Sequence, residues 1–222
     1  MKTQAMFTAV AAALSISAAQ ANPRIVSVEV HAQLLHEEVD VRIEKEVATV
    51  SGTYKFKNDS RGYVNLQIYL PVYAKEGTPE EQMRPVFKID GEQELKARFI
   101  KAEWEKSDRN IKSFGELPQL EGQRVYWFLV PYIAQQPGQK DFTLGITYKQ
   151  QLSGDKFIYT PLIPKQMKDH DYGSITLSAD RPLKLVDSGK HDFVEKDGKL
   201  VVEPSDKRGI VVEAAKVKAK LP

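Results

Sequence analysis

The four histidines are the residues of this 222-residue chain best suited to metal or acid–base chemistry: His31, His36, His170 and His191. His31 and His36 are five residues apart around an expected strand, and an odd spacing on a strand sends side chains to opposite faces. His170 lies between Asp169 and Asp171, but the ligand spacings of zinc sites are absent. We therefore expect a solvated loop around His170 and predict no metal site.

Nucleophilic and cofactor motifs are also missing from the sequence. The chain has no cysteine, which excludes thiol catalysis and disulfides, and it has no G-x-S-x-G elbow and no phosphate-cradling glycine loop. We predict no catalytic and no cofactor-binding residue, and a protein that is not an enzyme. Two of the 30 acidic residues could still converge from separate strands, so a carbohydrate- or peptidoglycan-directed hydrolase stays open as an alternative.

The N-terminus has the features of a secretory signal peptide. Lys2 provides a positive start, residues 5–18 are uncharged and mostly small or apolar, and Ala19-Gln20-Ala21 is an A-x-A cleavage site. The apolar stretch is too short to span a bilayer, which takes roughly 20 residues. We predict removal of residues 1–21 by cleavage between Ala21 and Asn22, and a periplasmic or secreted protein. The lack of cysteine favours a bacterial source.

Charge argues against one class of partner. The chain holds 32 basic and 30 acidic residues, a net charge of +2, whereas a nucleic-acid binder needs a concentrated basic face. We expect no nucleic-acid partner, and no segment after the signal resembles a transmembrane span.

Hydrophobic alternation with a period of two runs through most of the chain and predicts strands with one buried face. It is clearest at 39–44, 50–57, 64–70 and 142–148. Further strands are expected at 24–35, 84–89, 94–103, 123–130, 155–160, 173–179, 191–196, 199–203 and 209–213. Such alternation is typical of antiparallel sheets. The prediction is an all-β, antiparallel β-sandwich of immunoglobulin-like type with a C-terminal β extension.

Turn signals divide these strands. Asp90-Gly91 and Asp197-Gly198 predict hairpins, because Asp-Gly tolerates positive φ, and Thr78 to Met83 predicts one helical turn with Thr78 as N-cap. Residues 107–122 are polar and patternless, which is typical of a functional loop or of disorder. We predict a sandwich over 22–165, followed by strands over 166–222 that either belong to it or form a small second unit.

Three consecutive aromatic residues, Tyr126, Trp127 and Phe128, lie within one expected strand. Neighbouring side chains on a strand point to opposite faces, so these rings cannot all enter the same core. We expect a second packed face on this strand, because large rings usually belong to cores.

Several segments resemble the VIT domain, the module shared by vault proteins and inter-α-trypsin-inhibitor heavy chains. The resembling segments are the strand that starts at Val47 and runs to Asn58-Asp59, Leu66 to Pro71, Phe87-Lys-Ile-Asp-Gly-Glu, Ile133 to Gly138, Phe142 to Tyr148, and Leu152. The resemblance covers about residues 28–165, and exported bacterial proteins of unknown function share this layout. It implies a β-sandwich interaction module without catalysis. The lysine- and alanine-rich stretch of that family is replaced here by Ser107 to Gly122.

The sequence thus favours an exported protein that acts by binding in the cell envelope or at the cell surface. The expected partner is another envelope or surface protein, with a glycan as the other ligand class. Recognition is expected through the loops around 71–84 and 107–122, or by strand pairing at a sheet edge. A periplasmic assembly chaperone that donates a strand to its client is a further alternative.

Overall fold

The computed structural model describes residues 23–29, 32–58, 64–113, 117, 122–135, 141–152, 154–159, 161, 173–188, 191–205 and 209–215. The predicted signal peptide and its cleavage site lie outside these ranges, and so do His31 and His170. Within them, no helix is long and apolar enough to cross a membrane.

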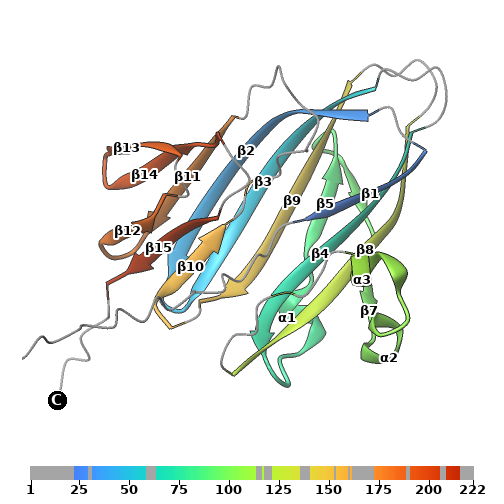
Figure 1. Ribbon diagram of the computed structural model, residues 1–222, viewed down its shortest axis with the longest axis horizontal. Helices are drawn as coiled ribbons and strands as arrows, with labels where there is room; N and C mark the ends of the chain where they lie inside the picture. Colours follow the sequence, from blue (N-terminus) through green and yellow to red (C-terminus); the bar gives the residue numbers. More distant parts are fainter. Residues whose placement is uncertain are drawn as a thin grey trace, which may run out of the picture.

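The largest sheet has eight strands in the order β13-β14-β11-β2-β3-β9-β5-β6 (Figure 1). Its strands are β2 (Ala32–Glu44), β3 (Val47–Asn58), β5 (Val86–Ile89), β6 (Gln93–Leu95), β9 (Asp141–Gln151), β11 (Ser174–Ala179), β13 (Asp192–Lys196) and β14 (Lys199–Glu203). The alternation that predicted the longer strands is the burial pattern observed in β2, β3 and β9. Val39, Val41 and Ile43 are fully buried, while Asp40 and Arg42 between them are exposed.

Two smaller sheets complete the fold. One has the order β1-β4-β8-β7 and the other β10-β15-β12. Their strands are β1 (Arg24–Glu29), β4 (Val64–Lys75), β7 (Arg98–Ile100), β8 (Gln123–Gln135), β10 (Lys156–Tyr159), β12 (Leu183–Asp187) and β15 (Ile210–Ala214). One buried cluster takes side chains from all three sheets, including Leu70, Leu144 and Val212. The predicted all-β sandwich-like fold is confirmed.

One strand pair departs from the antiparallel prediction. β11 lies parallel to β2, with Ile175 beside Val39 and Leu177 beside Val41. The C-terminal strands therefore extend the sheet that the N-terminal strands begin. Alternation could not reveal this direction, because a strand buried on one face looks the same whichever way its neighbour runs.

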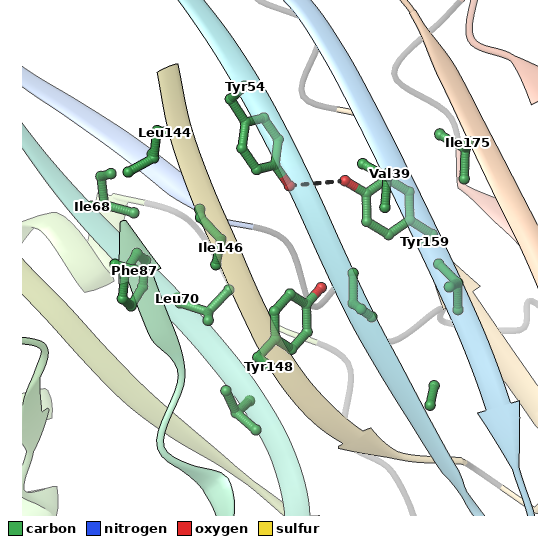
Figure 2. Close-up of a cluster of buried hydrophobic side chains, with 14 of the residues drawn as sticks. Val39, Tyr54, Ile68, Leu70, Phe87, Leu144, Ile146, Tyr148, Tyr159 and Ile175 are labelled. Atoms are coloured by element: carbon green, nitrogen blue, oxygen red, sulfur yellow. Dashed lines mark hydrogen bonds between the residues drawn. The ribbon is translucent and has the colours of Figure 1, made fainter. Parts of the chain in front are cut away.

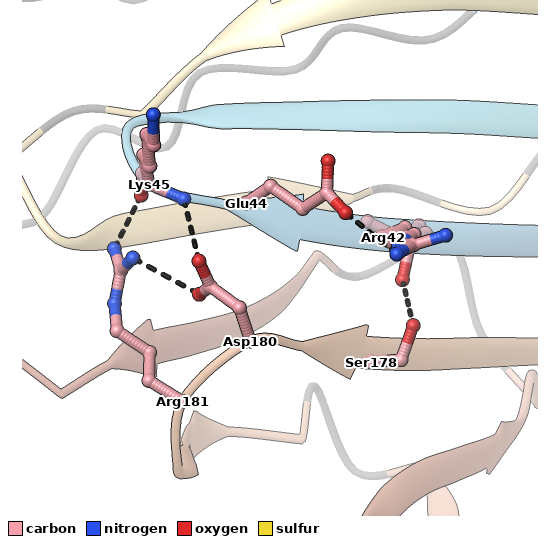
Figure 3. A network of polar contacts seen from close by, with 7 residues as sticks. Arg42, Glu44, Lys45, Ser178, Asp180 and Arg181 are labelled. Carbon is pink, nitrogen blue, oxygen red and sulfur yellow. Dashed lines mark hydrogen bonds and ion pairs between the residues drawn. The ribbon is translucent and has the colours of Figure 1, made fainter.

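The turn between β2 and β3 is held from the C-terminal part of the chain (Figure 3). Lys45 adopts a positive φ of 54°, and its backbone N–H donates to Asp180 Oδ2 at 3.1 Å. Arg181 Nη2 donates to the Lys45 carbonyl oxygen at 2.5 Å, and its Nη1 donates to Asp180 Oδ1 at 3.2 Å. Glycine or asparagine is usual at a positive φ, and here the residue is a lysine. The contacts from Asp180 and Arg181, more than 130 positions away, stabilise this conformation.

Four local expectations need correction. The single strand expected over 24–35 is wrong, because β1 belongs to the four-stranded sheet and β2 begins at Ala32 in the eight-stranded one. The single strand expected over 94–103 is wrong, because β6 belongs to the eight-stranded sheet, β7 to the four-stranded one, and α2 (Ala102–Glu105) follows. The helical turn is present as α1 (Glu80–Met83), but its N-cap is Pro79. Thr78 instead donates its hydroxyl to the Lys75 carbonyl at 2.7 Å, which closes the preceding turn. The patternless 107–122 stretch contains a helix, α3 (Arg109–Ser113).

The second packed face expected around Trp127 is present. Trp127 and Phe128 are 2% and 0% exposed, and they belong to different buried clusters. Trp127 packs on the outer side of the four-stranded sheet with Tyr69, Ile100 and Ile111. Helix α3 supplies Ile111, so part of the predicted loop packs against this face of the sheet.

Candidate functional site

A buried carboxylate lies in the main core among tyrosines. Glu37 on β2 is 3% exposed and faces Tyr54 on the neighbouring β3. The Tyr159 hydroxyl on β10 donates to Glu37 Oε1 at 2.5 Å, and the hydroxyl oxygens of Tyr54 and Tyr159 are 3.2 Å apart. Figure 2 shows the Tyr54 and Tyr159 hydroxyls pointing toward each other, with Tyr148 nearby on β9. We call Glu37, Tyr54, Tyr148 and Tyr159 the tyrosine cluster.

The environment of the tyrosine cluster keeps its phenols protonated. Burial raises the pKa of Tyr54, Tyr148 and Tyr159, and the neighbouring Glu37 charge raises each pKa further. A neutral phenol remains a hydrogen-bond donor, so Tyr159 can hold the carboxylate at every physiological pH. The sequence carried a signal for Glu37, because it falls in phase with Val39 and Val41. Glu37, Tyr54 and Tyr159 are each 3% exposed or less, whereas Tyr148 also lines the cleft described next.

The accessible candidate site is a cleft of about 510 Å³ beside the end of β4. Four parts of the chain line it: the start of β3, the end of β4, the second half of β9, and a segment that runs from the turn before α1 to the first residue of β5. The lining residues are Val47, Thr49, Tyr73, Ala74, Thr78, Glu81, Gln82, Met83, Arg84, Val86, Thr147, Tyr148, Lys149, Gln150 and Gln151. The segment 71–84, which the sequence analysis predicted for recognition, therefore provides one wall.

Two buried polar groups in the cleft lining lack hydrogen-bond partners. Tyr73 and Gln150 are 1% and 3% exposed, and within the described chain neither the Tyr73 hydroxyl nor Gln150 Oε1 makes a hydrogen bond. Burial raises the pKa of Tyr73 to about 12, and the Arg24 charge opposes part of this rise. Each unsatisfied buried group costs about 1–3 kcal/mol. Both atoms are themselves closed to solvent, so a molecule in the cleft would gain affinity from them only after the side chains over them move.

Charges of both signs also line the cleft. Glu81 and Lys149 are exposed, while the Arg84 guanidinium is engaged with Glu80 and with the Ala97 carbonyl at 3.4 Å. Among the described lining residues Glu81 is the only carboxylate. The pair of acids that glycoside hydrolysis requires is not assembled in this lining.

The histidines do not converge in the described chain. His191 is buried, and its Nδ1 accepts the Ser205 backbone N–H at 3.1 Å. His36 lies near Gly173, where an added Cβ would come within 3.0 Å of His36 Cε1 and 1.9 Å of the Glu37 carbonyl oxygen. Across the described residues there is no group of three or more metal-ligating side chains.

The start of the predicted 107–122 loop is fixed to the four-stranded sheet. Asp108 Oδ1 accepts the backbone N–H groups of Asn110 and Ile111 at 2.8 and 3.2 Å, the pattern of an N-cap. Tyr69 donates its hydroxyl to Asp108 Oδ2 at 3.2 Å and accepts from Asn110 Nδ2 at 3.0 Å. These contacts make residues 108–113 a packing element. Most of residues 114–121 lie outside the described chain.

Comparisons with known proteins identify a fold but no family. No protein-family model matches the chain, and no curated protein matches it. A solved structure from Legionella pneumophila, whose suggested role is nutrient binding, has a TM-score of 0.53 at 10% identity and is matched over 88% of this chain and 70% of its own. At this identity the likeness shows the fold alone.

Two peptidase-type structures match less well. Native yeast LTA4 hydrolase has a TM-score of 0.42 at 11% identity, over 86% of this chain and 30% of that protein. The M1 zinc metallopeptidase of Deinococcus radiodurans has a TM-score of 0.36 at 12% identity, over 82% of this chain and 42% of that one. This chain therefore spans less than half of either enzyme.

Proposed function

We propose that the protein is an exported, non-catalytic binding protein of the bacterial envelope that holds a small polar molecule in the cleft beside β4. The observation that carries this proposal is the pair of unpartnered groups in the cleft lining, the Tyr73 hydroxyl and Gln150 Oε1. Buried polar groups are almost always hydrogen-bonded. Five side-chain atoms of the described residues are such exceptions, and the two that belong to residues lining one cleft are explained if a ligand completes them.

The chemistry of the lining defines the ligand class. Gln150 Oε1 accepts hydrogen bonds only, while the Tyr73 hydroxyl both donates and accepts. The ligand must therefore offer hydrogen-bond donors, as hydroxyl, amide or ammonium groups do. Val47, Met83 and Val86 add apolar surface to the same lining, which suits a compact molecule with a carbon skeleton.

Two further observations support the proposal. The N-terminal sequence has the pattern of a secretory signal, and the Legionella protein of similar fold has nutrient binding as its suggested role. The single carboxylate in the described cleft lining favours binding over hydrolysis by paired acids.

Thermal melting of the purified protein against single named compounds tests the ligand class. Suitable probes are glucose, N-acetylglucosamine, glutamate, glycerol and an Ala-Ala dipeptide. A ligand at a concentration 100 times its Kd stabilises the folded state by about 2.7 kcal/mol, which gives a clear shift in Tm.

N-terminal sequencing tests the export part of the proposal. Protein purified from the periplasmic fraction should begin at Asn22.

Substitutions at the two groups distinguish this cleft from other binding surfaces. Tyr73→Phe and Gln150→Leu remove the unpartnered atoms, so the free protein should keep or gain stability while the ligand-induced shift is lost. Tyr126→Phe is the matched control, since Tyr126 lies outside the cleft lining and its hydroxyl makes only a 3.5 Å contact with the Lys75 carbonyl. A ligand shift that survives both cleft substitutions would remove this site from consideration. Release of cleaved products would favour the hydrolase instead.

A further inference from the structure

The strand β13 forms one end of the eight-stranded sheet and is exposed along its whole length. Each of its five residues is exposed, and Phe193 and Val194 show 50% and 62% of their surface to solvent. β14 is its one partner among the described strands. An open edge presents unpaired N–H and C=O groups and is a template for another strand.

The charges of β13 are badly matched within the chain. Asp192 lies directly opposite Glu203 on β14, and Lys196 lies directly opposite Lys199. Like charges facing each other across a strand pair are destabilising. Neither Asp192 nor Lys196 forms an ion pair in the described part of the chain.

The hairpin also determines which backbone groups face outward. Asp197 and Gly198 have φ of 52° and 71°, and they form a two-residue loop between the paired Lys196 and Lys199. In such a loop the flanking residues exchange hydrogen bonds, and the pattern then alternates along the strand. Asp192, Val194 and Lys196 therefore bond to β14, while the N–H and C=O of Phe193 and Glu195 point to the open edge.

We propose that β13 pairs with β13 of a second copy of this chain, antiparallel about a two-fold axis at Val194. In that register Phe193 of each copy exchanges backbone hydrogen bonds with Glu195 of the other, which uses the outward-facing groups. Asp192 then meets Lys196 of the other copy at both ends, and the two Val194 side chains cover each other. The sequence Asp-Phe-Val-Glu-Lys is thus complementary to itself in antiparallel pairing.

This pairing compensates for the like charges that face each other within the β13–β14 hairpin. In the pair of copies, Asp192 would lie between Glu203 of its own chain and a lysine of the other, and Lys196 between Lys199 and an aspartate. Charged side chains usually protect an edge strand from pairing, but here a second copy brings the opposite charge to each. The short strand gives a small contact, so we expect a concentration-dependent, salt-sensitive dimer.

Sedimentation velocity over a concentration series of the purified protein tests the proposal. Asp192→Lys places a lysine at both ends of β13, and Lys196→Asp places an aspartate at both, so each variant should dimerise at least about tenfold more weakly. Each substitution also improves the charge match with β14, so loss of stability cannot explain that result. An equimolar mixture of the two variants should form a heterodimer, and the double variant should recover self-association.

A backbone variant checks the contact independently. Phe193→Pro removes an N–H that faces the open edge and should abolish dimerisation, while circular dichroism shows that the fold is kept. A wild-type protein that stays monomeric throughout the series would overturn the proposal. So would failure of the two charge variants to associate with each other, or a dimer that persists in Phe193→Pro. Pairing of β13 with a strand of a different protein in place of a second copy would also count against it.

Discussion

A Cβ atom built at Gly52 would lie 2.5 Å from the hydroxyl oxygen of Tyr54 and 2.7 Å from its ring, because that ring lies over the glycine. Real Cβ atoms do not approach other atoms this closely, so Gly52→Ala must displace the ring. The displaced Tyr54 would lose its 3.2 Å contact with Tyr159. We expect a loss of about 1–3 kcal/mol in the free energy of unfolding, measured by urea denaturation.

Gly145→Ala is the control for this substitution. Gly145 lies on the adjacent strand, opposite Thr53, and the nearest atoms to its added Cβ are at 3.8 and 3.9 Å, in ordinary contact. The free energy of unfolding of the Gly145→Ala variant should fall by no more than about 0.5 kcal/mol. A rise is also consistent, because alanine loses less backbone entropy on folding than glycine does. Equal losses at both glycines would show that the Tyr54 ring is not the cause.

Tyr159→Phe should destabilise the protein more than removal of any exposed phenol hydroxyl. The substitution removes a donor from the buried Glu37 carboxylate and a partner from Tyr54. Loss of a hydrogen bond to a buried charged group costs about 1.5–3 kcal/mol. Chemical denaturation checks this value, with Tyr126→Phe as the comparison. If the two variants unfold at the same denaturant concentration, the tyrosine cluster does not stabilise the fold.

Stability should fall at alkaline pH because of the buried phenols. The ordinary tyrosine pKa of 10.0 applies to the unfolded chain, whereas burial raises the pKa of Tyr73 to about 12 and those of Tyr54, Tyr148 and Tyr159 well above 10. A raised pKa means that the folded state binds more protons above pH 10, so the stabilisation present below pH 10 is lost as the pH rises. Absorbance at 295 nm follows ionisation, and circular dichroism follows unfolding.

The alkaline titration should therefore have two parts. Some of the nine tyrosines should ionise gradually, and the buried ones should ionise together with loss of the fold. A single smooth titration of all nine with an intact circular dichroism spectrum would contradict the described burial. Tyr54→Phe has two opposing effects on the pH of unfolding. It removes one buried phenol that would ionise, which raises that pH, and it removes a hydrogen bond to Tyr159, which lowers it.

The two tryptophans should differ in fluorescence. Trp104 is 53% exposed, with the Arg98 guanidinium 5.4 Å from its ring centroid, while Trp127 is 2% exposed beneath α3. Iodide should quench the fluorescence of Trp104 but not that of Trp127. The Trp104→Phe variant should therefore show a blue-shifted emission that iodide does not quench. Strong quenching of that variant would mean that α3 does not cover Trp127 in solution.

Much of the local structure could be predicted from alternation and turn chemistry. Asp90 and Asp197 both take positive φ, as their Asp-Gly pairs predicted. The turn at Lys45 could not be predicted, because its conformation depends on Asp180 and Arg181. A strand prediction also failed over 94–103, where the chain passes between two sheets. Lys96 is exposed and Ala97 is buried there, so the two-residue alternation continues through the crossing and does not reveal it.

The candidate site was partly visible in the sequence. Gln150 falls in phase with Ile146 and Tyr148 on the buried face of β9, so it could have been noted as a polar residue in a core position. Tyr73 gave no such signal, because both faces of β4 are buried near its end. The cleft itself joins four separated segments, and single-sequence patterns do not report contacts of that range. The resemblance to the VIT domain stays a prediction.

The parallel pairing of β2 with β11 has a consequence for how the chain folds. β2 can pair with β3 as soon as both exist, but its other edge waits for residues 174–179, more than 130 positions later. Until they arrive, the backbone N–H and C=O groups along this edge of β2 are unpaired and open to wrong pairing or aggregation. Closing so distant a contact is slow. The late strand therefore acts as the closing step of folding, and a chain truncated before Ser174 should be far more prone to aggregate than the whole protein.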